Sequence, residues 1–211
     1  MARAGEDRSF GQQVIEGYGL VGQAWIERSE ALDSAALYAP VLDLLPLKPV
    51  MVADIGAGSG RDAAWFSRQG HDVTAVEPTA RLSDAGKDLY RDLPLRWIDD
   101  RLPHLERLPD TPTYDLIVVN GVWQHLEDDQ RAIAMRRLAM LAKGGGLMIV
   151  SLRHGPGAAT RPVQPIDPDV TIELAAAAGF RLLRQRMADS LQEVNKAAGV
   201  TWTWLALEKT G

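Results

Sequence analysis

Residues 52–61 read Val-Ala-Asp-Ile-Gly-Ala-Gly-Ser-Gly-Arg. The apolar run meets an acid at Asp54, and glycines then stand at two-residue spacing at Gly56, Gly58 and Gly60, after which the sequence becomes helical. A backbone that passes close under a bulky ligand needs residues that lack a Cβ and reach positive φ. A strand, glycine-rich loop and helix supply this, and the helix N-terminus then points at the ligand. The segment therefore predicts a ligand-binding turn at the end of a buried strand.

The spacing of the glycines indicates which ligand the turn binds. Dinucleotide-binding turns carry G-x-G-x-x-G, whereas this chain carries D-x-G-x-G-x-G at residues 54–60. The pattern resembles motif I of the class I S-adenosylmethionine-dependent methyltransferases. The resemblance covers residues 50–157 and implies S-adenosylmethionine as cofactor, with S-adenosylhomocysteine as product.

Composition places the chain among globular α/β proteins. Its 211 residues are 46% hydrophobic and 24% charged, which suits one domain with a small appendage. Residues 1–10 are polar and charged, and no apolar stretch approaches the roughly 18 residues of a membrane-spanning helix, so we expect neither a signal peptide nor a membrane span. The chain has no cysteine, which fits a reducing cytoplasm.

The charge balance argues against a nucleic-acid partner. The formal net charge is −5, whereas nucleic-acid binders neutralise phosphates with lysine and arginine. Arg181, Arg184 and Arg186 alternate on an expected strand and read as a solvated face. We therefore expect a small-molecule methyl acceptor and a protein that is a monomer or a homodimer.

Two regions are expected along the chain. Residues 1–49 predict a helical appendage that could act as a lid, with helices at 21–36 and 38–45, and residues 50–211 predict the cofactor-binding domain. Apolar runs that alternate with helical patterns indicate a mostly parallel sheet with helices on both faces. The expected strands are 50–55, 72–77, 95–98, 114–119, 146–151, 180–187 and 200–208. The expected helices are 61–69, 80–90, 128–142 and 169–178.

The last two expected strands are joined by residues 188–199, which are polar and turn-like. So short a connection favours an antiparallel hairpin. The resemblance implies the same arrangement: a Rossmann-like, seven-stranded sheet of order 3-2-1-4-5-7-6 with the last strand antiparallel.

Ligands of open α/β sheets bind at the carboxyl ends of the strands, so the loops there hold the expected cofactor contacts. Glu77 and Pro78 end the second strand, where the resemblance implies an acid that accepts from ribose hydroxyls. Asp99, Asp100 and Arg101 follow the third strand, where the resemblance implies an acid that accepts from the adenine amino group, and either Asp99 or Asp100 could be that acid. The full predicted cofactor set is Asp54, Gly56, Ala57, Gly58, Gly60, Arg61, Glu77, Pro78, Asp99, Asp100, Arg101, Asn120, Gly121 and Tyr18.

Residues 120–126, Asn-Gly-Val-Trp-Gln-His-Leu, follow the fourth strand. Methyltransferases that act on amines of DNA bases carry Asn/Asp-Pro-Pro-aromatic at this point, so the departure argues against that subclass. His125 here and His154 in the fifth loop are the candidate bases, because a histidine with a pKa near ~6.5 can take a proton at neutral pH. No two histidines have metal-ligand spacing, so we expect no metal.

Acceptor contacts are expected at Trp123, Arg153 and Trp25, and we expect an oxygen or nitrogen acceptor before a carbon one. Two other functions remain open. The chain could be a cofactor-binding module without catalysis, because no base is unambiguous. An NAD(P)-dependent oxidoreductase is disfavoured by the glycine spacing.

Overall fold

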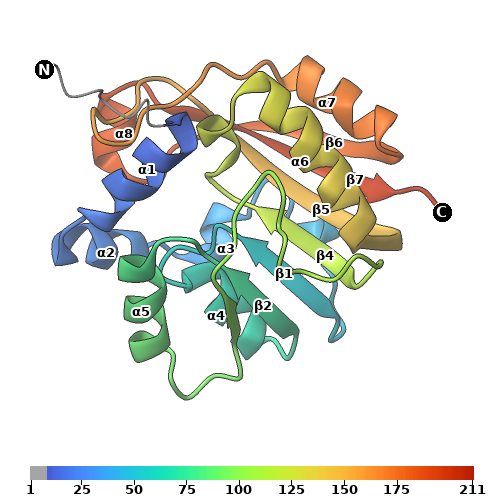
Figure 1. Ribbon diagram of the computed structural model, residues 1–211, viewed down its shortest axis with the longest axis horizontal. Coiled ribbons are helices and arrows are strands. Elements are labelled where there is room, and N and C mark those ends of the chain that lie inside the picture. Colours follow the sequence, from blue (N-terminus) through green and yellow to red (C-terminus); the bar gives the residue numbers. More distant parts are fainter. Residues whose placement is uncertain (1–8) are drawn as a thin grey trace, which may run out of the picture.

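Seven strands form one sheet in the computed structural model, which describes residues 9–211. The strand order is β3-β2-β1-β4-β5-β7-β6 (Figure 1). Strand β1 pairs in parallel with β2 and β4, whereas β7 runs antiparallel to β5 and β6. The predicted α/β fold, its strand order and its antiparallel last strand are confirmed.

The strands match the expected ones within a few residues, apart from β5, which is longer. They are β1 (Met51–Ile55), β2 (Asp72–Val76), β3 (Arg96–Ile98), β4 (Tyr114–Val119), β5 (Ala142–His154), β6 (Phe180–Asp189) and β7 (Thr201–Lys209). The helices are α1 (Phe10–Gly19), α2 (Gln23–Glu30), α3 (Ser34–Leu37), α4 (Arg61–Arg68), α5 (Ala80–Leu89), α6 (Asp128–Leu141), α7 (Pro168–Ala177) and α8 (Glu193–Ala197), with 3-10 turns η1 (Leu42–Leu44) and η2 (Trp123–His125).

The sheet separates two apolar cores, because successive side chains of a strand point to opposite faces. Ala53 of β1 packs in the core under α6 and α7, and its neighbour Val52 packs in the core under α4. Leu138 of α6 and Phe66 of α4 are buried in these two cores. The sheet is therefore held rigidly on both faces, which fixes the loops at its carboxyl edge.

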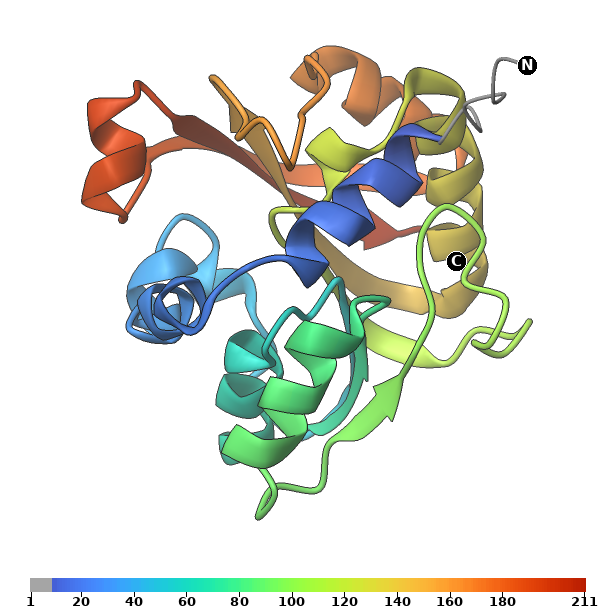
Figure 2. The same ribbon diagram turned by 60° about the vertical axis from the view of Figure 1, so that its left-hand side comes forward.

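Helix α1 lies within the predicted appendage but was not expected from the sequence. Gly11, Gly17 and Gly19 give this segment a low intrinsic helix propensity. Two features compensate. The Ser9 hydroxyl caps the helix by accepting from the Gln12 amide at 3.3 Å, and Val14 is buried by packing. The helix contacts α5 and η2, and Figures 1 and 2 both show it beside α5 at one edge of the sheet.

The expected helices 21–36 and 38–45 are wrong in extent. Residues 31–33 break the first into α2 and α3, because the Asp33 carboxylate accepts from the Ala35 amide at 2.9 Å and starts a new helix. In the second only the short turn η1 is helical, since Pro40 has no amide hydrogen to donate. Tyr38, Val41 and Leu45 are buried in the core under α4, so this part of the predicted appendage packs on the sheet. Residues 1–8 of the appendage lie outside the described residues.

Two further differences concern β5 and the final hairpin. Residues 144–146, expected to follow a helix, lie inside β5, and a Cβ at Gly146 would approach the Tyr114 carbonyl to 3.2 Å. This glycine therefore permits close pairing where the register with β4 shifts. The connection 188–199 forms the antiparallel hairpin as expected, but it contains the five-residue helix α8.

Candidate functional site

A cavity of about 1260 Å³ lies at the carboxyl edge of the sheet. Its floor is the loops after β1, β2 and β4, and its walls come from three distant parts of the chain. These are the segment from α1 to α3, the loop 153–163 after β5, and the β6–α8–β7 hairpin. Both views show these segments gathered around the same edge (Figures 1 and 2).

The glycine loop forms the floor. Gly56 and Gly58 have φ of 76° and 59°, a region that L side chains rarely adopt. The Gly56 and Ala57 amides both donate to the Val76 carbonyl, at 2.8 and 3.0 Å, which ties the loop to the end of β2. A Cβ at Gly58 would meet nothing within 4 Å. The loop therefore presents bare backbone to open space, as a cradle for a ligand requires.

Gly60 was predicted to touch the cofactor, but it does not line the cavity. It starts α4 with a φ of 86°, and a Cβ there would approach the Trp97 ring to 2.8 Å. Its role in the structure is to let the loop turn against that ring.

Asp54 and Asp62 are both buried at the cavity floor, and their surroundings differ. Asp62 accepts from Ser34 Oγ at 3.0 Å, Tyr38 Oη at 3.1 Å and Asn120 Nδ2 at 2.9 Å, and it pairs with Arg61 at 2.8 Å. Burial alone would raise the pKa of Asp62, but Arg61 and these donors bring it below its usual value.

Asp54 lacks such partners on one oxygen. Its buried Oδ2 has no hydrogen-bond partner among residues 9–211. Burial, and then the neighbouring Asp62 charge, raise the pKa of Asp54 well above its ordinary value. A buried acceptor without a donor is costly, so Asp54 is suited to a donor or cation supplied by a ligand.

Arg61 lines the cavity but is engaged by the protein itself. Its guanidinium pairs with Asp62 and donates to the Ser29 carbonyl at 2.9 Å. Burial opposes its charge, but the Asp62 carboxylate outweighs burial and raises the pKa of Arg61. Arg61 therefore fastens the N-terminal helices to the glycine loop.

Glu77 lies at the end of β2, as predicted, and lines the cavity beside Pro78. One carboxylate oxygen accepts from the Gly58 amide at 2.9 Å and the other from the Thr79 amide at 2.8 Å. Burial raises the pKa of Glu77, and these two bonds oppose the rise. A carboxylate has about four acceptor positions, so two remain for hydroxyl donors.

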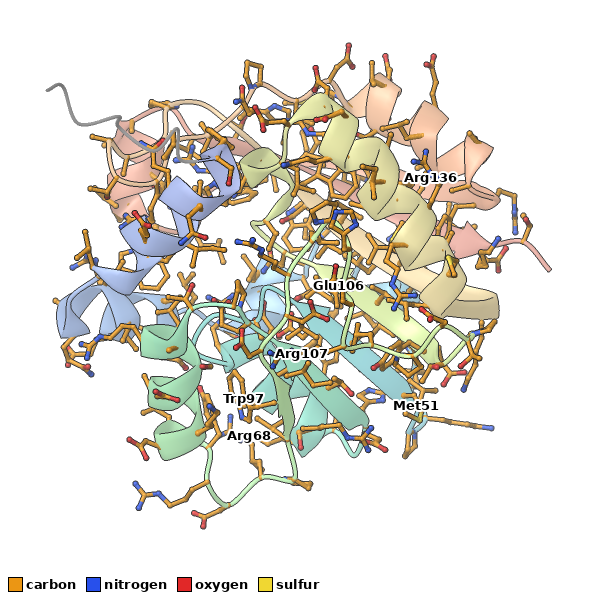
Figure 3. All side chains as sticks on the ribbon, viewed as in Figure 1. Met51, Arg68, Trp97, Glu106, Arg107 and Arg136 are labelled. Atoms are coloured by element: carbon orange, nitrogen blue, oxygen red, sulfur yellow. The ribbon has the colours of Figure 1, made fainter. Side chains whose placement is uncertain are left out.

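Asp100, rather than Asp99, lines the cavity. Its carboxylate accepts from the amides of Arg101 and Arg107, at 2.8 and 2.7 Å, and so is held in place by the loop after β3. Figure 3 labels Arg107 on this loop. Asp99 is exposed and lies 3.8 Å from the Arg107 guanidinium. The sequence left the choice between these acids open, and the structure favours Asp100. Arg101 also lines the cavity.

Asn120 and Gly121, after β4, line the cavity as predicted. Ser151 on β5 holds both: its hydroxyl donates to Asn120 Oδ1 at 2.7 Å and accepts from the Gly121 amide at 2.8 Å. With the Asn120–Asp62 bond, this chain of contacts joins β4, β5 and α4 beneath the cavity.

Tyr18 of α1 and His125 of η2 form a pair that lines the cavity wall, with Tyr18 Oη 3.1 Å from His125 Nε2. His125 Nδ1 lies 3.0 Å from the Pro162 carbonyl, which can only accept, so Nδ1 carries the proton and Nε2 accepts from Tyr18. Burial lowers the pKa of His125 to about 4 despite the bond to Pro162, so the ring is neutral at pH 7. Burial also raises the pKa of Tyr18.

Two predicted site residues lie elsewhere. Trp123 is fully buried in the core under α6 and does not reach the cavity, because η2 turns its ring inward. His154 also lies outside the cavity, where its Nε2 is 2.8 Å from Thr203 Oγ1 across the β5–β7 pair. The structure therefore does not support Trp123 as an acceptor contact or His154 as a base.

Arg153 and Trp25, both predicted as acceptor contacts, line the cavity. Sequence reasoning missed Asp62, Arg161 and Trp202, which line it as well. Asp62 directly follows the glycine motif and could have been found there. Arg161 and Trp202 carry no local signal, since only the folding of distant segments brings them to this edge.

The described residues contain no group of three or more His, Cys, Asp or Glu that could hold a metal ion. Within residues 9–211, no helix is long and apolar enough to cross a membrane.

Comparison with known proteins gives a consistent picture. Residues 53–150 match a family model described as a methyltransferase domain. An uncharacterized methyltransferase of Mycobacterium tuberculosis is 32% identical over 124 residues, which are 56% of this chain and 61% of that protein. The chain thus spans less than two thirds of the length of this curated relative.

Solved structures share the fold at low identity. A cyclopropane synthase from Mycobacterium tuberculosis has a TM-score of 0.76 at 15% identity and covers 97% of this chain and 100% of its own. A 1,6-didemethyltoxoflavin-N1-methyltransferase from Burkholderia thailandensis, solved with 1,6-didemethyltoxoflavin and S-adenosylhomocysteine bound, has a TM-score of 0.68 at 23% identity and covers 90% of this chain and 82% of its own.

Proposed function

Because the chain belongs to the class I S-adenosylmethionine-dependent methyltransferase family, we propose that it binds S-adenosylmethionine and methylates an oxygen or nitrogen atom of a small molecule. The observation that carries the proposal is the free, buried Oδ2 of Asp54 beside the open backbone of the glycine loop. The acidic floor suits a cofactor that bears a sulfonium and an ammonium group.

The residues present fit this cofactor. Asp54 offers the ammonium a buried acceptor that the protein leaves unpaired. Glu77 keeps two acceptor positions for ribose hydroxyls after its bonds to Gly58 and Thr79. Asp100, held by two backbone amides, is the acceptor we assign to the adenine amino group. Gly56, Ala57 and Gly58 supply the close backbone surface.

When bound, the cofactor supplies a methyl group whose bond to sulfur breaks with the electron pair left on sulfur, while a lone pair of the acceptor forms the new bond to carbon. The chain's contribution is to hold the acceptor in line with this methyl group, since orientation supplies most of the rate. The Tyr18–His125 pair closes the opposite wall of the cavity, where an acceptor would lie.

We assign His125 as the base that accepts the proton of the methyl acceptor. Its Nδ1–H is fixed on Pro162, so the lone pair of Nε2 points toward Tyr18 and the cavity. An acceptor hydroxyl or amine that displaces the Tyr18 hydroxyl would donate to the same lone pair. The low pKa of His125 means that this nitrogen is unprotonated at neutral pH and available as an acceptor.

The proposal is tested by transfer of radiolabel from methyl-labelled S-adenosylmethionine to a metabolite extract. We expect label in at least one fraction, and His125→Gln to lower the rate by about 100-fold without weakening S-adenosylhomocysteine binding. His154→Gln, outside the cavity, is the matched control and should act like the wild type. Tight binding of the cofactor with no transfer to any fraction would instead favour a non-catalytic binding module. A cytoplasmic location and a monomeric or homodimeric state remain predictions.

A further inference from the structure

Charged residues of both signs line the cavity. Asp54, Asp62, Glu77 and Asp100 line the floor, and Arg153 and Arg161 line the wall beside the Tyr18–His125 pair. The other charged residues that line the cavity are Arg61, Arg101, Glu106, Asp129, Asp189 and Lys196. Asp62 already neutralises Arg61 on the floor. Neither Arg153 nor Arg161 has a carboxylate within 4.0 Å among the described residues. The wall therefore carries two positive charges that the protein does not balance locally.

Arg153 is positioned without being neutralised. Its Nη1 donates to the carbonyls of Gly155 and Pro156, at 3.2 and 2.6 Å. Carbonyls carry no net charge, so these bonds fix the guanidinium and leave its full charge facing the cavity. Arginine has five N–H donors, which is more than these two bonds need.

Arg161 is held by aromatic rings. Its guanidinium carbon lies 5.2 Å from the Tyr18 ring centre and 5.7 Å from the Trp25 ring centre. Such cation–π contacts orient a guanidinium but do not cancel its charge. Gly17 makes this contact possible, because a Cβ there would lie 1.7 Å from the Thr160 carbonyl oxygen.

Both arginines act on the same place. Their charges add to the effect of burial in lowering the pKa of His125, and they oppose the larger rise that burial gives to the pKa of Tyr18. Both guanidiniums line the cavity near this pair, where we place the acceptor's reacting atom. Trp25, Tyr18 and Trp202 supply flat apolar surface around it.

The cavity has room for such a second ligand. Its volume of about 1260 Å³ exceeds the roughly 300–1,000 Å³ of a site for one drug-sized molecule. A cofactor on the acidic floor would leave the wall with the arginines and aromatic rings for the acceptor.

We infer that the methyl acceptor is an aromatic anion, with a carboxylate, sulfonate or phosphate group bound between Arg153 and Arg161. This inference rests on the proposed function and names the substrate class of the same site. Arginine suits this role because its planar fork of N–H groups matches such oxyanions. The acidic floor then favours the cationic cofactor, and the wall with Arg153 and Arg161 favours an anionic acceptor.

The anion subsite is tested first by binding alone. The probe is 8-anilinonaphthalene-1-sulfonate, titrated by fluorescence into protein saturated with S-adenosylhomocysteine, and the matched neutral probe is N-phenyl-1-naphthylamine, which lacks the sulfonate. We expect Arg153→Gln and Arg161→Gln each to weaken binding of the sulfonate by about tenfold and binding of the neutral probe by less than twofold. Arg186→Gln, exposed on β6 outside the cavity, is the control and should change neither.

Three results would overturn the inference. Equal losses for both probes, or no loss for either, would mean that the arginines do not bind an anionic group. A loss of S-adenosylhomocysteine affinity as large as that of the sulfonate would assign the arginines to the carboxylate of the cofactor.

The acceptor itself is tested by separating the metabolite extract on an anion-exchange column before the transfer assay. We expect the methyl acceptor among the retained, anionic compounds, with its KM raised in both arginine variants. Transfer only to the unretained fraction would contradict the inference and leave the methyltransferase proposal intact. If no fraction receives label, the methyltransferase proposal is contradicted. The probe titrations would then still decide whether the anion subsite exists.

Discussion

Two buried aspartates eight positions apart show how surroundings, rather than residue type, assign a role. Asp62 is surrounded by donors and by Arg61, so it is ionised and structural. Asp54 lines the cavity and keeps a buried oxygen without a hydrogen-bond partner among the described residues, so its carboxyl is suited to a donor supplied by a ligand. The sequence identified Asp54 by its place in the glycine motif but gave no sign that the next acid would join the N-terminal helices to the sheet.

Replacing Asp62 tests this structural role. Asp62→Asn would leave the mostly buried Arg61 charge without its carboxylate, so we expect the free energy of unfolding to fall by about 3–5 kcal/mol. Asp84→Asn removes an exposed ion pair with Lys87 and should cost less than about 1 kcal/mol. Urea unfolding of both variants measures the difference. Equal costs would contradict a central role for Asp62.

The low pKa of His125 predicts a pH dependence of stability. Between pH 6.5 and about 4, the unfolded chain binds a proton at this ring and the folded protein does not. Folding stability therefore falls as the pH drops through this window, and the contribution of the neutral ring is fully present only above it. Thermal unfolding of the wild type and His125→Gln should give melting temperatures that approach each other, or cross, as the pH falls from 7 to 4. A constant difference would mean that His125 titrates normally.

At the scale of elements, the carboxyl-edge loops were predictable and the walls of the cavity were not. Acids and glycines that follow apolar strands mark the edge of a parallel sheet, so Asp54, Glu77 and Asn120 could be assigned from local patterns. Helix α1 could not, because its glycines disfavour a helix and its packing on α5 and η2, which stabilises it, is long-range. For the same reason the sequence could place Tyr18 at the site but could not predict its contact with Arg161.

Gly17 is the position at which α1 and the loop 158–163 meet most closely, and its substitution tests their packing. Gly17→Ala would force a Cβ against the Thr160 carbonyl, so we expect a loss of about 1–3 kcal/mol in stability and a change in Trp25 fluorescence as Arg161 shifts. Gly11→Ala on the same helix meets nothing within 4 Å and should stabilise the protein by about 0.5–1 kcal/mol. If both alanines stabilise the protein, the close crossing of α1 and the loop is wrong.

At the scale of the whole molecule, the sheet follows from the alternation of apolar strands and helices, and the enclosure of the site follows from long-range packing. The strand order and the antiparallel hairpin could be predicted because a short connection and the family resemblance agreed. The positions of the Trp123 and His154 side chains, outside the cavity, could not be predicted, since a place at the end of a strand does not say whether a side chain turns toward the core or the cavity. That choice is made by η2 and by the pairing of β5 with β7.

Residues of the N-terminal helices and of the β6–α8–β7 hairpin both line the cavity, so segments far apart in the sequence meet at the site. Bonds from Ser34, Tyr38 and Ser29 to the Asp62–Arg61 pair fix the N-terminal side to the glycine loop. The site is thus built by the whole fold, and residues 53–150 contribute the floor, which we assign to the cofactor.

Calorimetric titration with S-adenosylhomocysteine, compared with NADH, tests the central claim most directly. We predict micromolar binding of S-adenosylhomocysteine, weak or no binding of NADH, and loss of binding in Gly58→Val, whose side chain would occupy the open space above the glycine loop. Gly70→Val, at another positive-φ glycine outside the cavity, controls for backbone strain and should still bind. Tighter binding of NADH, or full affinity in Gly58→Val, would contradict the assignment of this cavity to S-adenosylmethionine.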